Sequence, residues 1–517
     1  MQKKIILRLL PSEAMNDISI KQKIADAEGC RQNAVSGFHL IKKSIDARSK
    51  QPYIQLTVNA FINEPFVENK PVTYTFTDVH AAKRKVIIIG GGPAGLFAAL
   101  TLIAEGIQPI ILERGKDVRS RRRDLAALNK DGQVNPESNY CFGEGGAGTY
   151  SDGKLYTRSN KRGDINRILN LLVQFGAPEN ILYDAHPHIG TNKLPHIITS
   201  IRKLIEDCGG KFLFNQKVVD FEIENELIKK VQTAEGIWFE GEAVILATGH
   251  SARDIFHLLN DKKLLIEFKP FALGVRVEHP QSIIDNIQYH CDYRPNDLPP
   301  ASYSLVQQVS GKGVFSFCMC PGGIIAPAAT NPGEIVVNGW SPSKRNNPFA
   351  NSGMVVTVDA EDVQAYKKHH ALAGLYFQQA VEQKAFKAGG GKLIAPAQRM
   401  TDFVSGIVST SLPSCSYIPG IQSASLNEVL PSFIFKSLQK AFVEFGKKMK
   451  GYYTQEAVIV ATESRTSSPV RIPRDPITLN HPQVKNLYPC GEGAGYAGGI
   501  ISAAMDGERV SLKMASM

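Results

Sequence analysis

Hydrophobic and polar residues along the first 80 positions repeat with two different periods. Strand-like runs occur at Lys4–Leu10, Gly37–Asp46 and Tyr53–Phe61, the last with partial alternation. Residues Ile18–Glu28, between the first two runs, have apolar positions at helical spacing. The order β-α-β-β predicts a small α+β module at residues 1–80.

A different pattern begins at residue 85, where an apolar run leads into glycines. Residues 85–95 read Lys-Val-Ile-Ile-Ile-Gly-Gly-Gly-Pro-Ala-Gly, a helix-like stretch continues to Glu105, and a second apolar run ends on Glu113. A strand, GxGxxG, a helix and an acid about twenty residues further on form the fingerprint of a dinucleotide-binding unit, whose helix N-terminus attracts the pyrophosphate. The predicted contacts of the nucleotide are Gly90, Gly92, Pro93, Ala94 and Gly95, with Glu113 at the ribose.

The segments that complete this unit lie much later in the chain. A strand-like run at 243–246 leads into Ala247-Thr248-Gly249, and another begins at Leu487. The intervening residues contain strand-like runs, one of them at 334–338, and amphipathic stretches, one of them at 362–388, which favour a mostly antiparallel sheet with helices on one side. The pattern predicts the α/β class, with a Rossmann-type domain assembled from the discontinuous segments 81–264 and 455–517 and an inserted α+β substrate domain at 265–454.

Two more glycine-rich segments carry candidate binding residues. The segment from Gly491 to Ile500 follows a strand and opens a helix, which makes a second helix N-terminus suited to anions. The segment from Gly143 to Gly148 also fits GxGxxG, but no apolar run precedes it and no clear helix follows, so we expect a loop close to the bound dinucleotide and no separate NAD site. The predicted contacts are Gly145, Gly146, Gly148, Gly153, Lys154, Leu155, Ala247, Thr248, Gly249, Gly491, Glu492, Gly498, Gly499 and Ile500.

Composition limits the class of protein without identifying it. With 517 residues, of which 43% are hydrophobic and 21% charged, the chain is expected to form about two or three globular domains. Its eight cysteines lack a secreted-framework spacing, which favours reduced thiols and a cytoplasmic location. No apolar run is long enough to cross a bilayer, so we expect no membrane span. The net charge of +10 suits an anionic ligand or nucleic acid, although a charge excess spread over a large surface is the simpler interpretation.

Taken together, the segments around Gly90, Ala247 and Gly491 resemble those of two-dinucleotide-binding-domain flavoproteins of the glutathione-reductase type. The resemblance implies FAD as the cofactor, with Glu492, in place of the usual Asp, near its ribityl or pyrophosphate part. It also implies that an arginine of the basic segment 119–123 contacts the pyrophosphate. We assign that contact to Arg122, and Arg114 is a further candidate cofactor contact.

Longer motifs extend the resemblance over residues 85–517. They read FGEGGAGTYSDGKL from Phe142, ATGHSARD from Ala247, KPFALGVRVEHP from Lys269, FCMCPGG from Phe317, ESRTSSPVRI from Glu463 and GEGAGYAGGI from Gly491. These segments are similar to an uncharacterised group of bacterial FAD-dependent dehydrogenases within the NAD(P)/FAD-dependent oxidoreductases. The resemblance implies a flavoprotein oxidoreductase and implies no particular substrate.

Polar residues in several loops are candidates for the chemistry. His188, in a glycine-rich turn, is either a catalytic group or a histidine satisfied by the backbone, and the loose spacing of the neighbouring histidines argues against a metal site. Arg345, Glu463 and Arg465 suit an anionic substrate or the cofactor edge, with an interdomain hydrogen-bond network as the alternative. Lys154 is placed to neutralise the pyrophosphate or the reduced flavin.

Cys318 and Cys320 form a CxC pair at the end of a predicted strand. One interpretation is a redox dithiol that faces the flavin. The interpretation that we favour is a pair of buried structural thiols, because cysteines two apart on a strand have poor geometry for a disulfide.

The sequence as a whole predicts an FAD-dependent oxidoreductase, either a dehydrogenase or a reductase, that transfers hydride through flavin N5 to or from a small polar or anionic substrate. NAD(P)H is a candidate electron donor, without a dedicated fold to bind it. Two alternatives stay open: a flavin-dependent RNA-modifying enzyme that uses residues 1–80 as its nucleic-acid module, and a flavin-bound electron carrier without its own substrate turnover. The lack of RNP-like aromatic strands or a GXXG loop in that module argues against nucleic acid, and the oligomeric state stays open.

Overall fold

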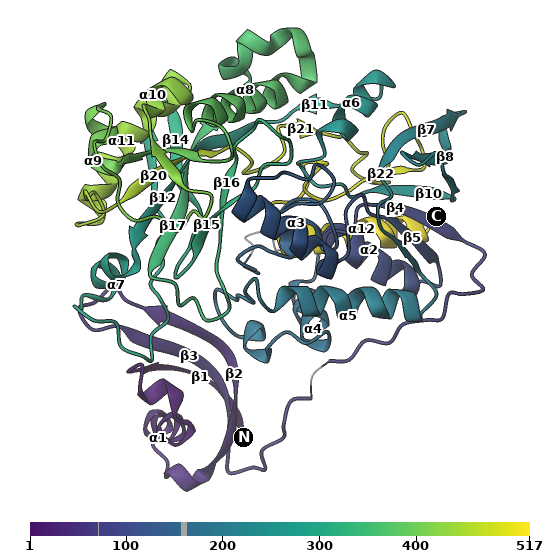
Figure 1. Ribbon diagram of the computed structural model, residues 1–517. Coiled ribbons are helices and arrows are strands. Elements are labelled where there is room, and N and C mark those ends of the chain that lie inside the picture. The colour runs from purple at the N-terminus through teal and green to yellow at the C-terminus, as the bar shows by residue number, and fades with distance from the viewer. Residues whose placement is uncertain (71, 157–162) are drawn as a thin grey trace.

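Residues 1–70, 72–156 and 163–517 are described by the computed structural model, in which the N-terminal module lies to one side of the two larger parts (Figure 1). The module contains β1 (Gln2–Leu9), α1 (Asp17–Glu28), β2 (Val35–Asp46) and β3 (Tyr53–Ile62). Its sheet is antiparallel, with the order β1-β3-β2. Ile5, Leu7 and Leu9 of β1 are buried, because alternate side chains of a strand share a face and this face packs on the core.

A five-stranded parallel sheet forms the nucleotide-binding part. Its strands have the order β22 (Leu487–Pro489), β10 (Ala243–Leu246), β4 (Lys85–Ile89), β5 (Gln108–Leu112) and β6 (Lys211–Leu213). Val86 and Ile88 of β4 belong to one hydrophobic core, whereas Ile87 and Ile89 belong to another. Both faces of this sheet are therefore covered, which is why β4 is a continuous apolar run rather than an alternating one.

Two helices from distant parts of the chain lie side by side against this sheet (Figure 1). They are α2 (Pro93–Ala104), which follows β4, and α12 (Ile500–Ala515), which follows β22. A Cβ atom at Gly507 would clash with the carbonyl oxygen of Ala94. The middle of α12 therefore touches the first turn of α2 backbone to backbone.

A seven-stranded, mostly antiparallel sheet forms the second large part. Its strands have the order β13 (Val306–Val309), β14 (Lys312–Cys320), β17 (Phe349–Val358), β12 (Phe271–Pro280), β20 (Val458–Glu463), β18 (Ala395–Arg399) and β19 (Ile421–Ser423). β20 begins after residue 454 and still pairs with β12 and β18, so this sheet extends past the end of the predicted insertion. We call residues 265–471 the cap.

Two local predictions in the cap need correction. Residues 334–338 do not enter the large sheet, because β16 (Val337–Trp340) pairs with β15 (Ile324–Pro327) in a separate hairpin. The helix predicted at 362–388 becomes regular only at α8 (Ala373–Ala388), since Ala360–Leu372 forms an irregular, tighter 3-10 helix in which His370 has a φ of +49°. A left-handed residue cannot continue an α-helix, so the apolar spacing there did not produce one.

The remaining elements complete the two large parts. They are α3 (Val118–Asp131), α4 (Ile165–Gln174), α5 (Leu194–Asp207), β7 (Val218–Glu224), β8 (Leu227–Thr233), β9 (Trp238–Glu240), α6 (Arg253–Asp261), β11 (Glu267–Phe268), α7 (Gln281–Tyr289), α9 (Met400–Ser405), α10 (Leu426–Val429), α11 (Ser432–Lys448) and β21 (Val470–Arg471). Within the described ranges, no helix has the length and apolar character needed to cross a membrane.

Candidate functional site

Glycines at positions 90, 95 and 491 allow four chain segments to pack closely together. Gly90 has a φ of +106°, and a Cβ atom there would lie 2.5 Å from the carbonyl oxygen of Ala247. A Cβ atom at Gly95 would clash with the carbonyl oxygen of Gly90, and one at Gly491 would lie 2.9 Å from Ala94. Glycine is the residue that permits such approaches. The end of β4, the first turn of α2 and the segments at 247 and 491 thus meet at one place.

Glu113 joins three backbone turns around this place. Its Oε2 accepts a hydrogen bond from the N–H of Gly91 at 2.8 Å, and its Oε1 accepts from the N–H groups of Gly115 and Gly143, both at 2.9 Å. Each carboxylate oxygen has two acceptor positions. Oε2 therefore retains one position for another donor, such as the ribose hydroxyl that the sequence motif predicts.

Arg121, and not Arg122, is the member of the basic segment that reaches the glycine loop. The Arg121 side chain is fully buried and donates to the carbonyl oxygens of Asn139, Glu144 and Gly146 at 2.8, 2.9 and 2.8 Å. Arg122 is exposed on α3, at a surface depression. Successive residues of a helix point about 100° apart, so the packing of α3 decides which arginine faces inward. The sequence did not reveal that choice.

The loop at 143–148 lies against the N-termini of both α2 and α12. Gly145 and Gly146 have φ values of +76° and +58°, and a Cβ atom at Gly146 would lie 3.1 Å from the Cα of Gly92. A Cβ atom at Gly148 would lie 3.2 Å from Pro93 and 3.5 Å from Ile500. This is the kind of close backbone approach that a loop beside a bound dinucleotide requires.

The segment from Gly491 is fixed by a residue that sequence reasoning missed. The N–H of Gly491 donates to Oδ2 of the buried Asp506 at 2.8 Å, and Asp506 pairs with Arg474 at 2.6 Å. The side chain of Glu492, the predicted acid, lies 3.7 Å from His250 instead. An aspartate within the apolar run at the start of α12 was the available signal, because such a residue is rarely buried without a specific partner.

Four glycines border open space at these helix N-termini, so the residues present fit FAD. Within the described chain, no atom lies within 4 Å of a Cβ built on Gly249, Gly498 or Gly499, and the nearest to one on Gly92 is 3.9 Å away. Gly92 and Gly499 are the N-cap residues of α2 and α12, and neither helix end shows a side-chain cap among the described residues. Free N–H groups beside space without side chains suit a pyrophosphate and a planar ring. We call these four glycines the cradle.

Other predicted cofactor residues have partners within the protein. Arg114 pairs with Glu137 at 2.6 Å and with Asp254 at 2.8 Å, so its charge is neutralised by the chain itself. Leu155 is buried, and its N–H donates to the carbonyl oxygen of Pro187 at 3.0 Å. Both residues support the surrounding loops, and their described contacts are all with the chain.

The same glycine loop continues into a cluster of polar side chains. Asp152 is buried, and its carboxylate lies 3.3 Å from Arg345 and 3.8 Å from both Lys154 and His188. Gly153, with a φ of +73°, packs against Gly190, and Lys154 is bridged to His188 through the backbone. Arg345 comes from the cap, in the loop between β16 and β17. The structure thus brings together His188, Arg345 and Lys154 of the predicted residues, and it adds Asp152.

Three polar atoms of this cluster are buried and have no hydrogen-bond partner among the described residues. They are Oδ1 of Asp152, Nε2 of His188 and Nε of Arg345. A buried polar group left unpaired costs about 1–3 kcal/mol. Two of these atoms, Oδ1 of Asp152 and Nε2 of His188, lie 3.8 Å apart, and the cluster is a candidate site for a polar ligand.

The charges of the cluster are unequal. Burial, followed by the neighbouring Arg345, lowers the pKa of His188 to about 4, while Asp152 acts in the opposite direction. Burial would raise the pKa of Asp152, but Lys154 and Arg345 outweigh this effect and lower it. Near neutral pH the cluster therefore holds two cations, one carboxylate and a neutral imidazole, which leaves an excess of positive charge.

Glu463 lies beyond this cluster, in an ion pair that the sequence did not predict. Arg276 is fully buried and donates to Glu463 at 2.6 Å and to the carbonyl oxygen of Cys318 at 2.6 Å, while Lys154 donates to the carbonyl oxygen of Met319. Residues 318–320 therefore lie between the Asp152 cluster and the Arg276 pair. The strand register shifts there, and Cys318 has a φ of +44°. Such bulges re-aim backbone and side chains beside functional sites.

The CxC pair is not arranged as a redox dithiol. Burial raises the pKa of the Cys320 thiol to about 12, and its sulfur donates to the carbonyl oxygen of Cys318 at 3.2 Å. Burial also raises the pKa of the Cys318 thiol, but the residue as a whole is exposed, so the interpretation as a buried thiol holds for Cys320 and not for Cys318. Since the thiolate is the reactive form, neither thiol is activated at neutral pH.

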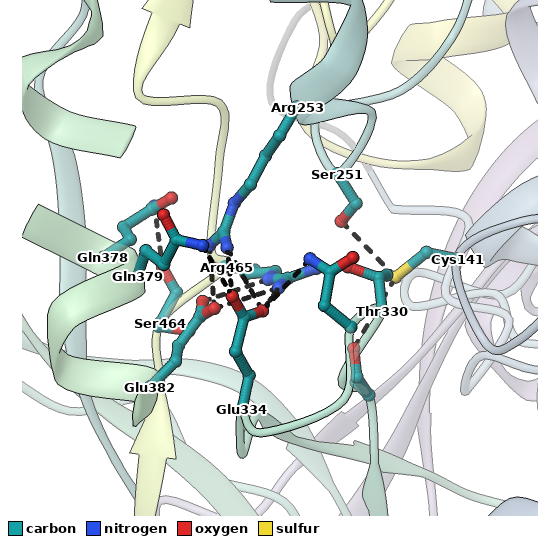
Figure 2. A network of polar contacts seen from close by, with 12 residues as sticks. Cys141, Ser251, Arg253, Thr330, Glu334, Gln378, Gln379, Glu382, Ser464 and Arg465 are labelled. Atoms are coloured by element: carbon teal, nitrogen blue, oxygen red, sulfur yellow. Dashed lines mark hydrogen bonds and ion pairs between the residues drawn. The ribbon is translucent and has the colours of Figure 1, made fainter. Parts of the chain in front are cut away.

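Arg465 belongs to a separate network that joins the two large parts (Figure 2). It pairs with Glu382 of α8 at 3.0 Å and with Glu334 at 3.2 Å. Arg253, the first residue of α6, pairs with the same two carboxylates at 2.7 and 3.2 Å. Burial would raise the pKa of Glu382, but Arg253 and Arg465 hold it at about 2. Of the two roles considered for Arg465, the structure supports the interdomain network.

Three protein-family models match the chain. Residues 1–61 match a domain of unknown function, residues 83–125 match an FAD binding domain, and residues 270–466 match the C-terminal domain-like model of FAD-dependent proteins. The FAD-binding match covers β4, α2 and β5, where the cradle begins. The chain thus contains two regions assigned to FAD-dependent proteins.

One similar protein matches nearly the whole chain. An uncharacterized protein of Clostridium beijerinckii is 39% identical over 510 residues, which are 95% of each chain. A D-amino acid dehydrogenase of Helicobacter pylori is 32% identical over 82 residues, which are 16% of this chain and 19% of the enzyme. The structure of 2,6-dihydroxypyridine-3-hydroxylase from Arthrobacter nicotinovorans covers 86% of this chain and 84% of its own, at 9% identity and a TM-score of 0.38. Nothing about the reaction follows from a likeness of that size.

Replacing Arg465 by methionine should lower the free energy of unfolding by about 3–5 kcal/mol, because Glu382 and Glu334 then share one buried arginine. Chemical denaturation of both chains measures the loss. Arg48→Met is the matched control, since the Arg48–Asp46 pair is exposed and its loss should have little effect. Equal, small losses in the two variants would contradict a clamping role for Arg465.

The depressed pKa of His188 predicts a pH dependence of stability. As pH falls from about 6.5 to about 4, the unfolded chain binds a proton at this position and the folded chain does not, so the free energy of unfolding falls by up to about 3 kcal/mol. In His188→Gln this part of the decline should disappear, whereas the exposed control His80→Gln should behave like the native chain. Denaturation at neutral pH and at about pH 4.5 tests this, and identical declines in all three chains would contradict it.

Proposed function

Because the chain belongs to the same family as the Clostridium beijerinckii protein and matches an FAD binding domain and a domain of FAD-dependent proteins, we propose that it is an oxidoreductase that acts on a small polar or anionic substrate. One observation carries the proposal. The unpaired buried atoms of Asp152, His188 and Arg345 lie at the end of the loop whose glycines touch the N-termini of α2 and α12. A polar ligand held there would lie next to the cofactor.

The cradle residues would hold FAD through backbone groups. Gly92 and Gly499 would present the first N–H groups of α2 and α12, and Glu113 would accept a hydrogen bond from the ribose. When bound, FAD would accept or donate a hydride equivalent, which is the chemistry that the side chains of the chain do not supply. The protein's part is then to bind the substrate, orient it and exclude water.

The substrate side is assigned to the Asp152 cluster. Arg345 has an unpaired Nε–H and a planar guanidinium, which suit a carboxylate or another planar anion. Lys154 adds a second positive charge, while Asp152 fixes the direction of Arg345. His188 is neutral and can exchange a hydrogen bond with a substrate hydroxyl or amine. An anionic group bound beside it would raise its pKa from about 4 and make it a better proton acceptor.

More specifically, we propose that the protein dehydrogenates a small acid that carries an amine or hydroxyl group. In the alternative, NAD(P)H supplies the electrons. The cap covers the cluster and supplies Arg345, so substrate recognition and water exclusion come from the same part. The excess positive charge of the cluster supports an acid over a neutral compound.

Gly92→Val should prevent FAD retention while leaving the fold intact. The new side chain would enter the space at the N-terminus of α2, where no described atom lies within 3.9 Å of the Cβ position. Gly313→Val in the cap is the matched control, since its Cβ position has ordinary contacts beginning at 3.4 Å. The flavin absorbance of each purified protein is the measurement. A fully yellow Gly92→Val protein would show that the pyrophosphate lies elsewhere.

An anaerobic titration tests the proposed reaction. A panel of amino and hydroxy acids, and then NADH and NADPH, is added to the yellow protein while the flavin absorbance is followed. We expect one of the acids to bleach the flavin, and we expect Arg345→Gln to raise the KM for that acid by about 10- to 100-fold through loss of a charged hydrogen bond. Arg48→Gln, an exposed arginine, is the control.

The remaining outcomes of this titration are equally informative. Bleaching by NADH or NADPH alone, with no response to any acid, would replace the dehydrogenase by a nicotinamide-fed reductase. A colourless protein that takes up no FAD would overturn the proposed function.

A further inference from the structure

The N-terminal module is hydrogen-bonded to the segment that leads into His188. The N–H of Lys43, in β2, donates to the carbonyl oxygen of Tyr183 at 2.8 Å, and the N–H of Ala185 donates to the carbonyl oxygen of Lys43 at 2.8 Å. Lys43 and Asp184 form a parallel bridge. β2 is an edge strand of its sheet, so this segment occupies positions that an edge leaves open for pairing.

The same segment is held on two further sides. Immediately after the bridge, the N–H of Leu155 donates to Pro187 at 3.0 Å, and the N–H of Ile189 donates to Gly153 at 3.1 Å, which places His188 opposite Lys154. Two residues further on, the N–H of Thr191 donates to Ser341 of the cap at 3.1 Å. Residues 183–191 are thus fixed by the module, by the glycine loop and by the cap loop that carries Arg345.

We propose that the N-terminal module is a working part of the substrate site, in which the backbone of Lys43 is a positioning element that holds residues 183–190 so that His188 stays against Asp152. This inference rests on the proposed function for the identity of the site. It assigns a role to residues 1–62, whose βαββ fold the cofactor does not require. Lys43 touches neither the cofactor nor the reacting atoms, so its role is positioning.

The geometry explains why a backbone contact can have this effect. In an extended segment, a shift by one residue turns every side chain to the opposite face. Fixing Asp184 against Lys43 sets the register of the residues that follow, and the orientation of His188 depends on that register. Without the bridge at Asp184, this segment would be held only through Pro187, Ile189 and Thr191, and residues 183–186 would be free to change register.

The module also brings charge to the edge of the site. His186 packs edge to face on Tyr156, with ring centroids 5.0 Å apart. Burial lowers the pKa of His186, and Lys42 of the module, Arg345 and Lys154 lower it further. Lys42 thus places a cation of the module near His186, which is consistent with an anionic substrate.

Lys43→Pro isolates the proposed contact. Proline removes the N–H that reaches Tyr183, and this N–H points away from β3, so the pairing of β2 with β3 is retained. Ile45→Pro is the matched control, because its N–H lies on the same side of β2 two residues further on. Lys43→Ala keeps the N–H and changes only the side chain, so it should behave like the native chain.

Hydrogen exchange of the full-length, flavin-bound protein is the first measurement. In Lys43→Pro, amides in the peptide covering 183–190 should exchange about tenfold faster, as expected when one hydrogen bond that protects a segment is lost. The second measurement is the NMR titration of the His188 imidazole, whose pKa should rise from about 4 towards its ordinary value as burial is lost. Ile45→Pro and Lys43→Ala should leave both readouts unchanged.

Two results would overturn the proposal: native exchange at 183–190 in a folded Lys43→Pro protein, or equal loosening in Ile45→Pro. If Lys43→Pro does not fold, Ala185→Pro removes the second hydrogen bond from the other side and must produce the same rise in the His188 pKa. Neither readout requires a substrate. A positive result here combined with no effect of Arg345→Gln on the acid titration would therefore reject the proposed function and retain the positioning role.

Discussion

Direct contact between backbones at glycine positions is the constraint on which the nucleotide-binding part depends. Side chains at Gly95 and Gly507 would clash with the carbonyl oxygens of Gly90 and Ala94, and one at Gly493 would lie 2.5 Å from that of Gly249. Because these layers touch without intervening side chains, the N-termini of α2 and α12 meet at one place. Any larger residue would separate the layers by about the thickness of a methyl group, which a close-packed interior does not absorb.

A second constraint, buried charge, fixes the cap over this place. Arg253 belongs to the nucleotide-binding part, whereas Glu334, Glu382 and Arg465 belong to the cap, and the four side chains form one balanced network. Buried ion pairs of this kind often add little net stability, because desolvation offsets their attraction, but they penalise every arrangement that leaves a charge unpaired. The same network joins the cap, which carries Arg345, to the nucleotide-binding part, which carries Asp152.

The sequence predicted those features that depend on local pattern. The strand, glycines and helix at 85–105 and the second glycine-rich helix start could both be read from spacing and residue type, whereas His188 and Arg345 were separate candidates whose proximity the pattern did not show. The βαββ order of residues 1–62 followed from hydrophobic periodicity, and the cap sheet from strand-like runs. These properties are local, and the chain adopts them where its tertiary contacts are compatible with them.

Features that depend on which segments meet were missed. Arg121 and Arg122 are adjacent, and only the packing of α3 against the glycine loop separates a buried side chain from an exposed one. Glu463 and Arg465 looked like one polar cluster, yet they pair with Arg276 and with Glu382, residues more than 80 positions away along the chain. Asp152, next to the predicted Gly153, was not itself predicted. Nothing in the motif shows that its carboxylate lies close to a lysine, an arginine and a histidine.

The position of α12 near the end of the chain has a consequence for the synthesis of the protein. Gly92 of the cradle lies at the start of α2, and Gly498 and Gly499 lie at the start of α12. The ribosome has therefore made nearly the whole chain before both helix ends exist. Synthesis at about 5–20 residues per second separates the two by tens of seconds. From the synthesis of β10 until that of β22, β10 is an unpaired edge of the sheet, and the nascent chain must avoid aggregation without the stabilising free energy of a bound flavin. Loading of the cofactor is therefore a step that follows translation.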